Sequence, residues 1–127
     1  MYKFYLAAGT ILSGLGVILG AFGAHRLKEI APDSVPTFQT GVQYQMYHAF
    51  ALILVGILFE KIPVRAMHWA GISFLIGILL FSGSLYALTA LKSTGKVGLG
   101  GIGIITPIGG LFFIMGWVAL LLAVLKK

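Results

Sequence analysis

The sequence predicts an all-α membrane protein, built as a four-transmembrane-helix bundle whose packing seams are rich in glycine. Of the 127 residues, 59% are hydrophobic and only 9% are charged, against about 25% charged in an average soluble domain. The apolar residues are gathered in four long runs. A helix needs about 20 such residues to cross a hydrocarbon core about 30 Å thick. We therefore expect one integral membrane domain over residues 1–127.

Charged residues mark the ends of the four expected helices. The first is expected over residues 4–24, between Lys3 and Arg26. Its apolar run is longer than the roughly 7–15 residues of a signal peptide, which favours a retained helix. The other three helices are expected over residues 42–59, 67–91 and 104–125. The short connections between them leave no room for a soluble domain.

Two connections have unusual compositions. Residues 25–41 contain two prolines and several charged side chains, which suits a solvated loop with a short interfacial helix. Residues 95–110 contain seven glycines, and each lowers helix propensity by about 1 kcal/mol relative to alanine. The isoleucines between these glycines are too apolar for an open loop. We expect irregular backbone that dips into the membrane edge, with Pro107 near the first turn of the fourth helix.

The charge and the lack of cysteine exclude several other classes. The net charge is +6, but the nine Lys and Arg residues are scattered between apolar runs, so no basic face is available for a nucleic acid. Without cysteine the chain has neither a disulfide framework nor a thiolate site. The expected partners are the lipid bilayer and either further copies, as a homo-oligomer, or a larger membrane protein.

Loop charges predict the orientation. One side of the expected helices carries five Lys and Arg residues and the other side carries four. Positive charges in short loops favour the cytoplasmic side. We therefore expect both termini in the cytoplasm and the protein in the cell inner (plasma) membrane. A difference of one charge would also suit insertion in both orientations.

Small residues predict where the helices pack, because close approach rather than the hydrophobic effect drives helix association in lipid. In the first helix they recur at heptad-like steps and include one strict GxxxG motif. The predicted packing positions are Gly9, Ser13, Gly16, Gly20, Gly23, Gly77 and Gly116. Such seams are common in membrane bundles, so they indicate packing rather than a particular activity.

Polar side chains within the spans are the candidate functional residues, since each is expensive to place in lipid. We expect most of them in the half of the bilayer opposite the termini: His25, Tyr44, Gln45, His48, Ser84, Tyr86 and Thr106. This convergence predicts either a polar pocket or a hydrogen-bond network that fixes the bundle. In a single network, substitutions of Gln45 and His48 would be energetically coupled.

Other kinds of site lack the residues they need. No Asp or Glu lies within an expected span, which argues against a proton-coupled exporter with a buried carboxylate. No second His, Cys or carboxylate shares the helix face of His48, so no metal is expected, and no cofactor is implied. The single aspartate, Asp33, lies in a loop, so no Ser-His-Asp arrangement is available. We expect no catalytic residues and no enzyme.

Four motifs in order resemble a known family. They are residues 20–27 (GAFGAHRL), 38–49 (FQTGVQYQMYHA), 81–88 (FSGSLYAL) and 105–110 (ITPIGG), the last followed by Gly116 and Trp117. In this order the chain is similar, over essentially its whole length, to the domain of unknown function 423 family of small four-helix bacterial membrane proteins. Membership implies an integral membrane protein with no assigned reaction.

Three functions remain open for such a chain. The first is a non-enzymatic accessory or structural bundle, which packs against larger partners through its small-residue seams. The second is a binder or transporter of a small molecule, ion or lipid, with a polar pocket around Gln45 and His48. The third is an intramembrane enzyme, for which the chain offers His25 and His48 as acid–base groups and little else. We favour the first.

Overall fold

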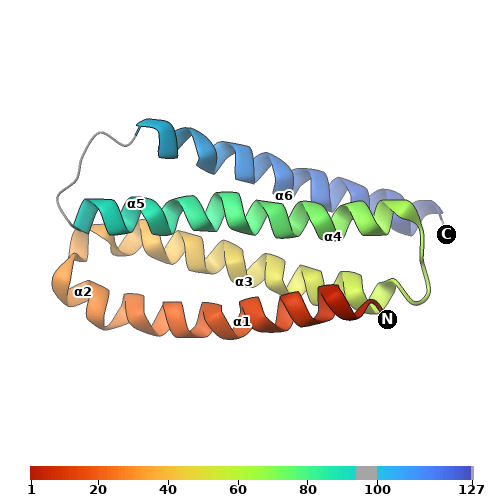
Figure 1. The fold of residues 1–127 in the computed structure, drawn as a ribbon, viewed down its shortest axis with the longest axis horizontal. Coiled ribbons are helices and arrows are strands. Elements are labelled where there is room, and N and C mark those ends of the chain that lie inside the picture. The colour runs from red at the N-terminus through yellow and green to blue at the C-terminus, as the bar shows by residue number, and fades with distance from the viewer. Residues whose placement is uncertain (94–99, 127) are drawn as a thin grey trace.

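The protein is a bundle of four membrane-crossing helical segments. The computed structural model describes residues 1–93 and 100–126, and the long elements in these ranges are all helices (Figure 1). Four segments are long and apolar enough to cross a membrane: Lys3–Ile30, Pro32–Leu58, Arg65–Lys92 and Ile102–Lys126. The first segment begins at the end of the bundle where the last one finishes (Figure 1). The predicted fold class is confirmed.

The first half of the chain contains α1 (Lys3–Ala24), α2 (Arg26–Ile30), the 3₁₀ turn η1 (Pro32–Ser34) and α3 (Val35–Leu58). The expected start of the second long helix at residue 42 is therefore wrong, because α3 begins at Val35. Pro36 lies in the first turn of α3, where a missing N–H costs no hydrogen bond. The expected loop over residues 25–41 is thus reduced to α2 and η1.

The third membrane-crossing segment is a continuous helix with a π-helical turn in its middle. It consists of α4 (Arg65–Gly77), the π turn η2 (Ile78–Ser82) and α5 (Gly83–Ser93), where a single helix over residues 67–91 was expected. A π turn contains one extra residue per turn, which rotates the side chains that follow it. Here η2 places Phe81 against α6 and buries Ser82 beside α3.

The fourth long helix, α6 (Gly100–Lys126), runs through most of the glycine-rich stretch. The expectation of irregular backbone is therefore wrong for residues 100–110, whereas residues 95–99 lie outside the described ranges. Pro107 lies inside the helix rather than in its first turn. In lipid a helix satisfies its own backbone groups, which outweighs the low helix propensity of glycine, and membrane helices tolerate proline.

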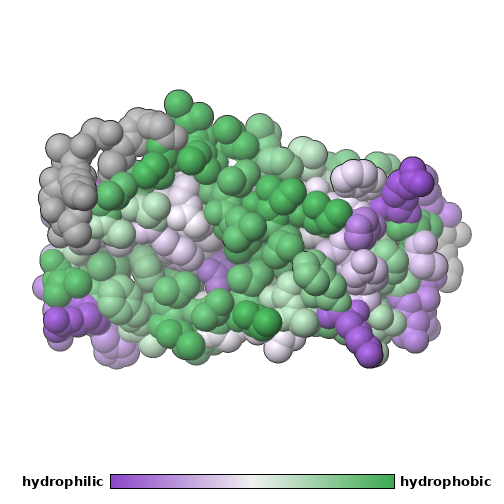
Figure 2. All heavy atoms as spheres, viewed as in Figure 1, coloured by the Kyte–Doolittle hydropathy of each residue, from purple (hydrophilic) through white to green (hydrophobic). Residues whose placement is uncertain are grey.

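The long helices form two packed pairs. α1 lies against α3 and α6 lies against α4, while α3 also contacts α4 and α5 (Figure 1). Half of the apolar window of α3 is buried, against 17% for α1 and 28% for α6. Most side chains of α1 and α6 are thus exposed on the outside of the bundle. Figure 2 shows apolar side chains across the middle of the molecule and hydrophilic ones gathered toward its two ends, as a bilayer requires.

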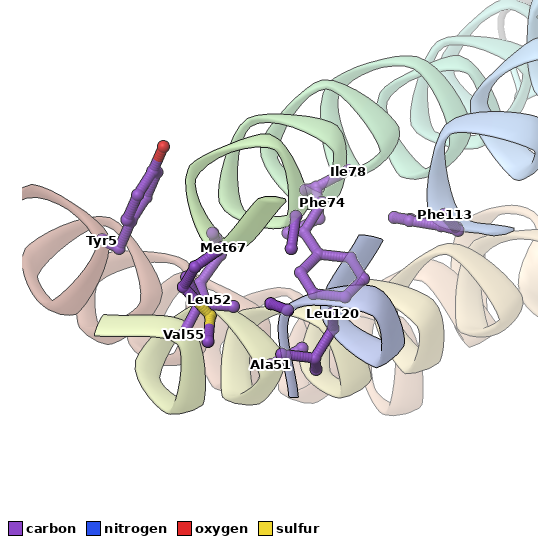
Figure 3. Close-up of a cluster of buried hydrophobic side chains, with 11 residues drawn as sticks. Tyr5, Ala51, Leu52, Val55, Met67, Phe74, Ile78, Phe113 and Leu120 are labelled. Atoms are coloured by element: carbon purple, nitrogen blue, oxygen red, sulfur yellow. The ribbon is translucent and has the colours of Figure 1, made fainter. Parts of the chain in front are cut away.

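One cluster of buried side chains joins four helical segments (Figure 3). Tyr5 of α1, Leu52 and Val55 of α3, and Met67 and Phe74 of α4 have no exposed surface. The remaining members of the cluster are Ala51 of α3, Ala70 of α4, Ile78 of η2, and Phe113, Leu120 and Ala123 of α6. Because lipid tails are as apolar as these side chains, the cluster stabilises the bundle through dense packing rather than through removal of water.

Aromatic rings lie directly on glycines where α4 meets its neighbours. The ring of Phe113 of α6 covers Gly77 of α4, and in return the ring of Phe74 covers Gly116 of α6. A Cβ atom added at Gly116 would lie 2.5 Å from Phe74 Cδ1, closer than two carbon atoms can pack. This reciprocal arrangement lets α4 and α6 approach closely.

The predicted seam of α1 meets α3 at three glycines spaced seven residues apart. Gly9, Gly16 and Gly23 are buried, and added Cβ atoms would meet Ala49, Met46 and Phe38 of α3, respectively. Gly20 is less crowded, because its added Cβ would be 3.6 Å from Val42 Cγ1, an ordinary contact. Ser13 donates to Gly9 O of its own helix at 2.7 Å.

Candidate functional site

A hydrogen-bonded chain that we call the Gln45 relay links three helices. It consists of Tyr86, Gln45 and the carbonyl of Leu12. Tyr86 Oη of α5 donates to Gln45 Oε1 at 2.6 Å, and Gln45 Nε2 donates to Leu12 O of α1 at 2.7 Å. Gln45 itself is almost fully buried in α3. Both ends of its amide are therefore used, and α1, α3 and α5 are held together at one level.

A second link, which we call the His48 pair, joins His48 of α3 to Trp117 of α6. His48 Nδ1 lies 2.8 Å from Tyr44 O, and since a carbonyl only accepts, Nδ1 carries the hydrogen. Trp117 Nε1 donates to His48 Nε2 at 3.0 Å, so Nε2 is the unprotonated nitrogen. The imidazole also stacks on Phe113, with centroids 3.6 Å apart and 8° between the planes. This neutral ring has no nitrogen left for a metal or a substrate.

Hydroxyl groups of η2 and α5 form further links between neighbouring segments. Ser82 Oγ donates to Gly41 O of α3 at 2.6 Å. Ser84 Oγ donates to Phe81 O at 2.8 Å, so its single hydrogen is used. Thr106 Oγ1 of α6 is then the donor in the 2.5 Å hydrogen bond between Thr106 and Ser84. α5 is thereby tied to α6.

The predicted polar residues border different cavities in the described ranges: Tyr44 and His48 line one, and Gln45 and Tyr86 line another. Gln45 hydrogen-bonds to α1 and α5, whereas His48, three residues further along α3, hydrogen-bonds to α6. His25 is exposed, and its Nδ1 lies 2.8 Å from Ala21 O of its own helix. The hydroxyl of Tyr44 makes no hydrogen bond within the described ranges, and its ring lies 4.7 Å from that of Phe81.

Three residues that link helices are absent from the predicted site residues, namely Tyr5, Ser82 and Trp117. Tyr5 Oη lies 2.9 Å from His68 Nδ1 and donates to His68 O at 3.1 Å, which connects α1 to α4. The available signal for Trp117 was its indole N–H, which needs a partner inside a span. No comparable signal in the sequence distinguishes Ser82 from the other serines.

Two cavities border these links. One of about 260 Å³ lies beside the Gln45 relay, with apolar walls such as Leu15 and Leu79. The other, of about 670 Å³, lies beside the His48 pair between α3 and α6. Within residues 1–93 and 100–126, no three His, Asp or Glu side chains are grouped closely enough to hold a metal ion.

Comparison with known proteins gives the family. A family model described as "Protein of unknown function (DUF423)" matches residues 19–110, which is most of the chain. The chain belongs to this family. It is 41% identical over 126 residues to the UPF0382 membrane protein YwdK of Bacillus subtilis, covering 98% of each chain. It is 38% identical over 125 residues to the UPF0382 membrane protein SAB0533 of Staphylococcus aureus, covering 98% of this chain and 97% of the relative.

Membership in this family fits the geometry. The relatives are named as membrane proteins, in agreement with the four apolar segments. The family description assigns no reaction. The matched residues 19–110 include the seven predicted polar residues but not Trp117. No solved structure matches the chain.

The tautomer of His48 provides a direct check on the His48 pair. In the protein labelled with ¹⁵N histidine, we expect Nδ1 of His48 to resonate as a protonated, pyrrole-type nitrogen and Nε2 as an unprotonated acceptor. Trp117→Phe should shift the Nε2 resonance and leave the Nδ1 resonance in place, because only Nε2 receives the indole hydrogen. A proton on Nε2 in the wild type would contradict the assigned hydrogen bonds.

Proposed function

We propose that this protein is a non-enzymatic membrane component, an accessory or structural bundle that packs against a larger membrane protein or against further copies of itself. The main support for this proposal is that the buried polar side chains bind to one another or to the backbone of the bundle. Gln45, His48, Ser82 and Ser84 each hydrogen-bond within the bundle. In the described ranges, no buried side-chain nitrogen or oxygen lacks a partner. The buried polar groups thus serve to hold the helices together, which supports a structural role.

The outer helices provide the surface for such a partner. α1 and α6 expose large apolar side chains along much of their length, including Ile11 and Val17 of α1 and Leu111 and Leu121 of α6. These faces can meet either lipid or the apolar surface of another membrane protein, since the two environments differ little in polarity. The lipid bilayer is therefore the constant partner in this proposal.

The proposed location is the plasma membrane, with both termini in the cytoplasm. This orientation is supported by the loop charges, because five of the nine Lys and Arg residues belong to the side that holds the termini: Lys3, Lys61, Arg65, Lys126 and Lys127. Both ends of the chain face the same side of the bundle (Figure 1). Fusion of a fluorescent protein that matures only in the cytoplasm should give signal at either terminus, and signal at neither terminus would contradict this orientation.

Native mass spectrometry tests the accessory function. The protein is released gently from its own membranes, and the masses of its complexes are measured. For the wild type we expect either homo-oligomers or a complex with a second membrane protein. The folded Gln45→Ala, His48→Ala double variant should form the same complex, because neither side chain lies on the outer surface that meets the partner. A bare monomer from wild-type membranes would contradict the proposal.

A further inference from the structure

The cavity between α3 and α6 has the size and the walls of a small-molecule site. Its volume of about 670 Å³ lies within the range of about 300–1,000 Å³ that is typical of ligand pockets. The lining contains aromatic side chains from three segments: Tyr44 and Tyr47 of α3, Phe81 of η2, and Phe113 and Trp117 of α6. Tyr47 and Trp117 are about half exposed, so the cavity opens toward the outer surface of the bundle.

The packing of α6 explains why this space is open. Gly109 brings α6 onto the backbone of Phe81, while the His48 pair and the stacked ring of Phe113 separate α6 from α3. Gly110, which also lines the cavity, contributes no side chain to fill it. A Cβ atom added at Gly110 would lie 3.8 Å from Phe81 Cδ2, so the position has room for one.

Tyr44 and Tyr47 lie well inside α3, and their hydroxyl groups retain unused donors in the described ranges. Tyr47 is at the middle of α3, about 18 Å from the start of the helix at 1.5 Å per residue, whereas tyrosine is usually enriched at the membrane interfaces. Tyr47 Oη accepts from Gln43 Nε2 at 2.6 Å, and its own hydrogen has no acceptor in the described ranges. The hydroxyl hydrogen of Tyr44 likewise has no acceptor in the described ranges. Lipid tails offer no acceptor at this depth.

These features together select the chemistry of the occupant. Flat aromatic walls favour a flat conjugated ring, which stacks on them. The free hydroxyl hydrogens can donate to an acceptor such as a carbonyl oxygen. The cavity lining contains no Asp, Glu, Lys or Arg, and the neutral ring of His48 has both nitrogens occupied, so the ligand is neutral. The cavity is also lined by apolar side chains such as Leu111 and Ile114, which suit a ligand that carries a long apolar chain.

We propose that the cavity between α3 and α6 binds an isoprenoid quinone, whose ring lies among the aromatic side chains and whose carbonyl accepts from Tyr44 or Tyr47. A phospholipid fits less well, because its headgroup stays at the surface and its chains carry neither rings nor acceptors at this depth. The binding site goes beyond the accessory function and does not depend on which protein the bundle contacts.

Tryptophan fluorescence tests this proposal with little modification of the protein. The chain contains two tryptophans, so Trp69→Phe leaves Trp117 in the cavity wall as the single reporter. Quinones quench indole fluorescence at short range. Titration of menaquinone-4 into this variant in lipid nanodiscs should give saturable quenching. The Trp117→Phe variant, whose remaining Trp69 lines a different cavity, should show only the linear quenching of random collisions.

Substitutions in the Trp69→Phe background locate the site. Tyr44→Phe and Tyr47→Phe should together weaken binding about fivefold or more, as expected for the loss of a hydrogen bond. Gly110→Leu should abolish the saturable component by filling the cavity. The matched control Gly14→Leu, at a position with no neighbour within 4 Å, should bind like the parent. Thermal unfolding of each variant identifies any that fails to fold. If Gly110→Leu does not fold, the binding affinity of the tyrosine variants decides whether the site is in this cavity.

Three results would overturn the proposal. One is linear quenching of Trp117 with no saturation. Another is saturable quenching that is the same in the Gly110→Leu and double tyrosine variants as in the parent. The third is complete competition by squalene at the same concentration as menaquinone-4, because squalene has the isoprenoid chain but no ring or carbonyl, and the cavity would then be only an apolar slot.

Discussion

Gly109→Ala should lower the free energy of unfolding by about 3 kcal/mol, the upper end of the usual cost of overpacking. The added Cβ atom would lie 2.7 Å from Phe81 Cα and closer still to Phe81 N. Both atoms belong to the backbone of η2, so the clash is relieved only if α6 moves away from it. The separation would also strain the nearby hydrogen bond between Thr106 and Ser84.

The neighbouring glycine provides a matched control. Gly110→Ala adds the same methyl group one position later, where the nearest neighbouring atom is Phe81 Cδ2 at 3.8 Å. We expect this variant to be as stable as the wild type or slightly more so, because alanine favours a helix over glycine by about 1 kcal/mol. Unfolding is measured by steric trapping in bicelles. Equal losses in the two variants would contradict the packing of α6 on η2.

Gln45→Leu should lower the free energy of unfolding by about 2 kcal/mol. The change removes both hydrogen bonds of the Gln45 relay, each worth about 0.6 kcal/mol on average in membrane proteins and about 1.7 kcal/mol at most. It also leaves the hydroxyl of Tyr86 without its acceptor in a partly buried site, which adds a desolvation cost. The two side chains have similar volumes, so packing changes little.

Two further variants calibrate this result. Tyr86→Phe removes one of the two hydrogen bonds and should cost about half as much as Gln45→Leu. Gln43→Leu removes an amide on the exposed face of α3, whose hydrogen bond is to Tyr47 of the same helix, and should cost under about 0.5 kcal/mol. If Gln43→Leu lowered the free energy of unfolding as much as Gln45→Leu does, hydrogen bonds between helices would contribute no more to stability than those within one helix.

The fold could be predicted from the sequence because its main determinant is hydropathy. Runs of about 20 apolar residues between charged ones identify spans whatever their packing, and the number of long helices followed from this. Helix ends were less predictable. Pro36 and the glycines at positions 100–103 favour a loop on propensities measured in water. Pro36 is tolerated in the first turn of α3, and α6 begins at Gly100 because a membrane helix must satisfy its own backbone.

The candidate site could be predicted only in part, because its residue types are visible in the sequence and its pairings are not. Gln45 and His48 stood out as polar groups in an apolar span. Their separation into two sets of contacts depends on which neighbour each helix face meets, and this follows from helix packing. The same applies to Trp117 and Gly109, whose importance lies in a single contact with another segment.

The most direct test of the central claim, that polar side chains in the spans act as separate links between helices, is a pair of double-mutant cycles. One cycle combines Gln45→Leu with Tyr86→Phe, and the other combines Gln45→Leu with His48→Phe. We expect a coupling of about 1 kcal/mol in the first cycle and at most about 0.5 kcal/mol in the second, because Gln45 and His48 share no hydrogen-bond partner. No coupling in the first cycle, or equal coupling in both, would contradict the claim.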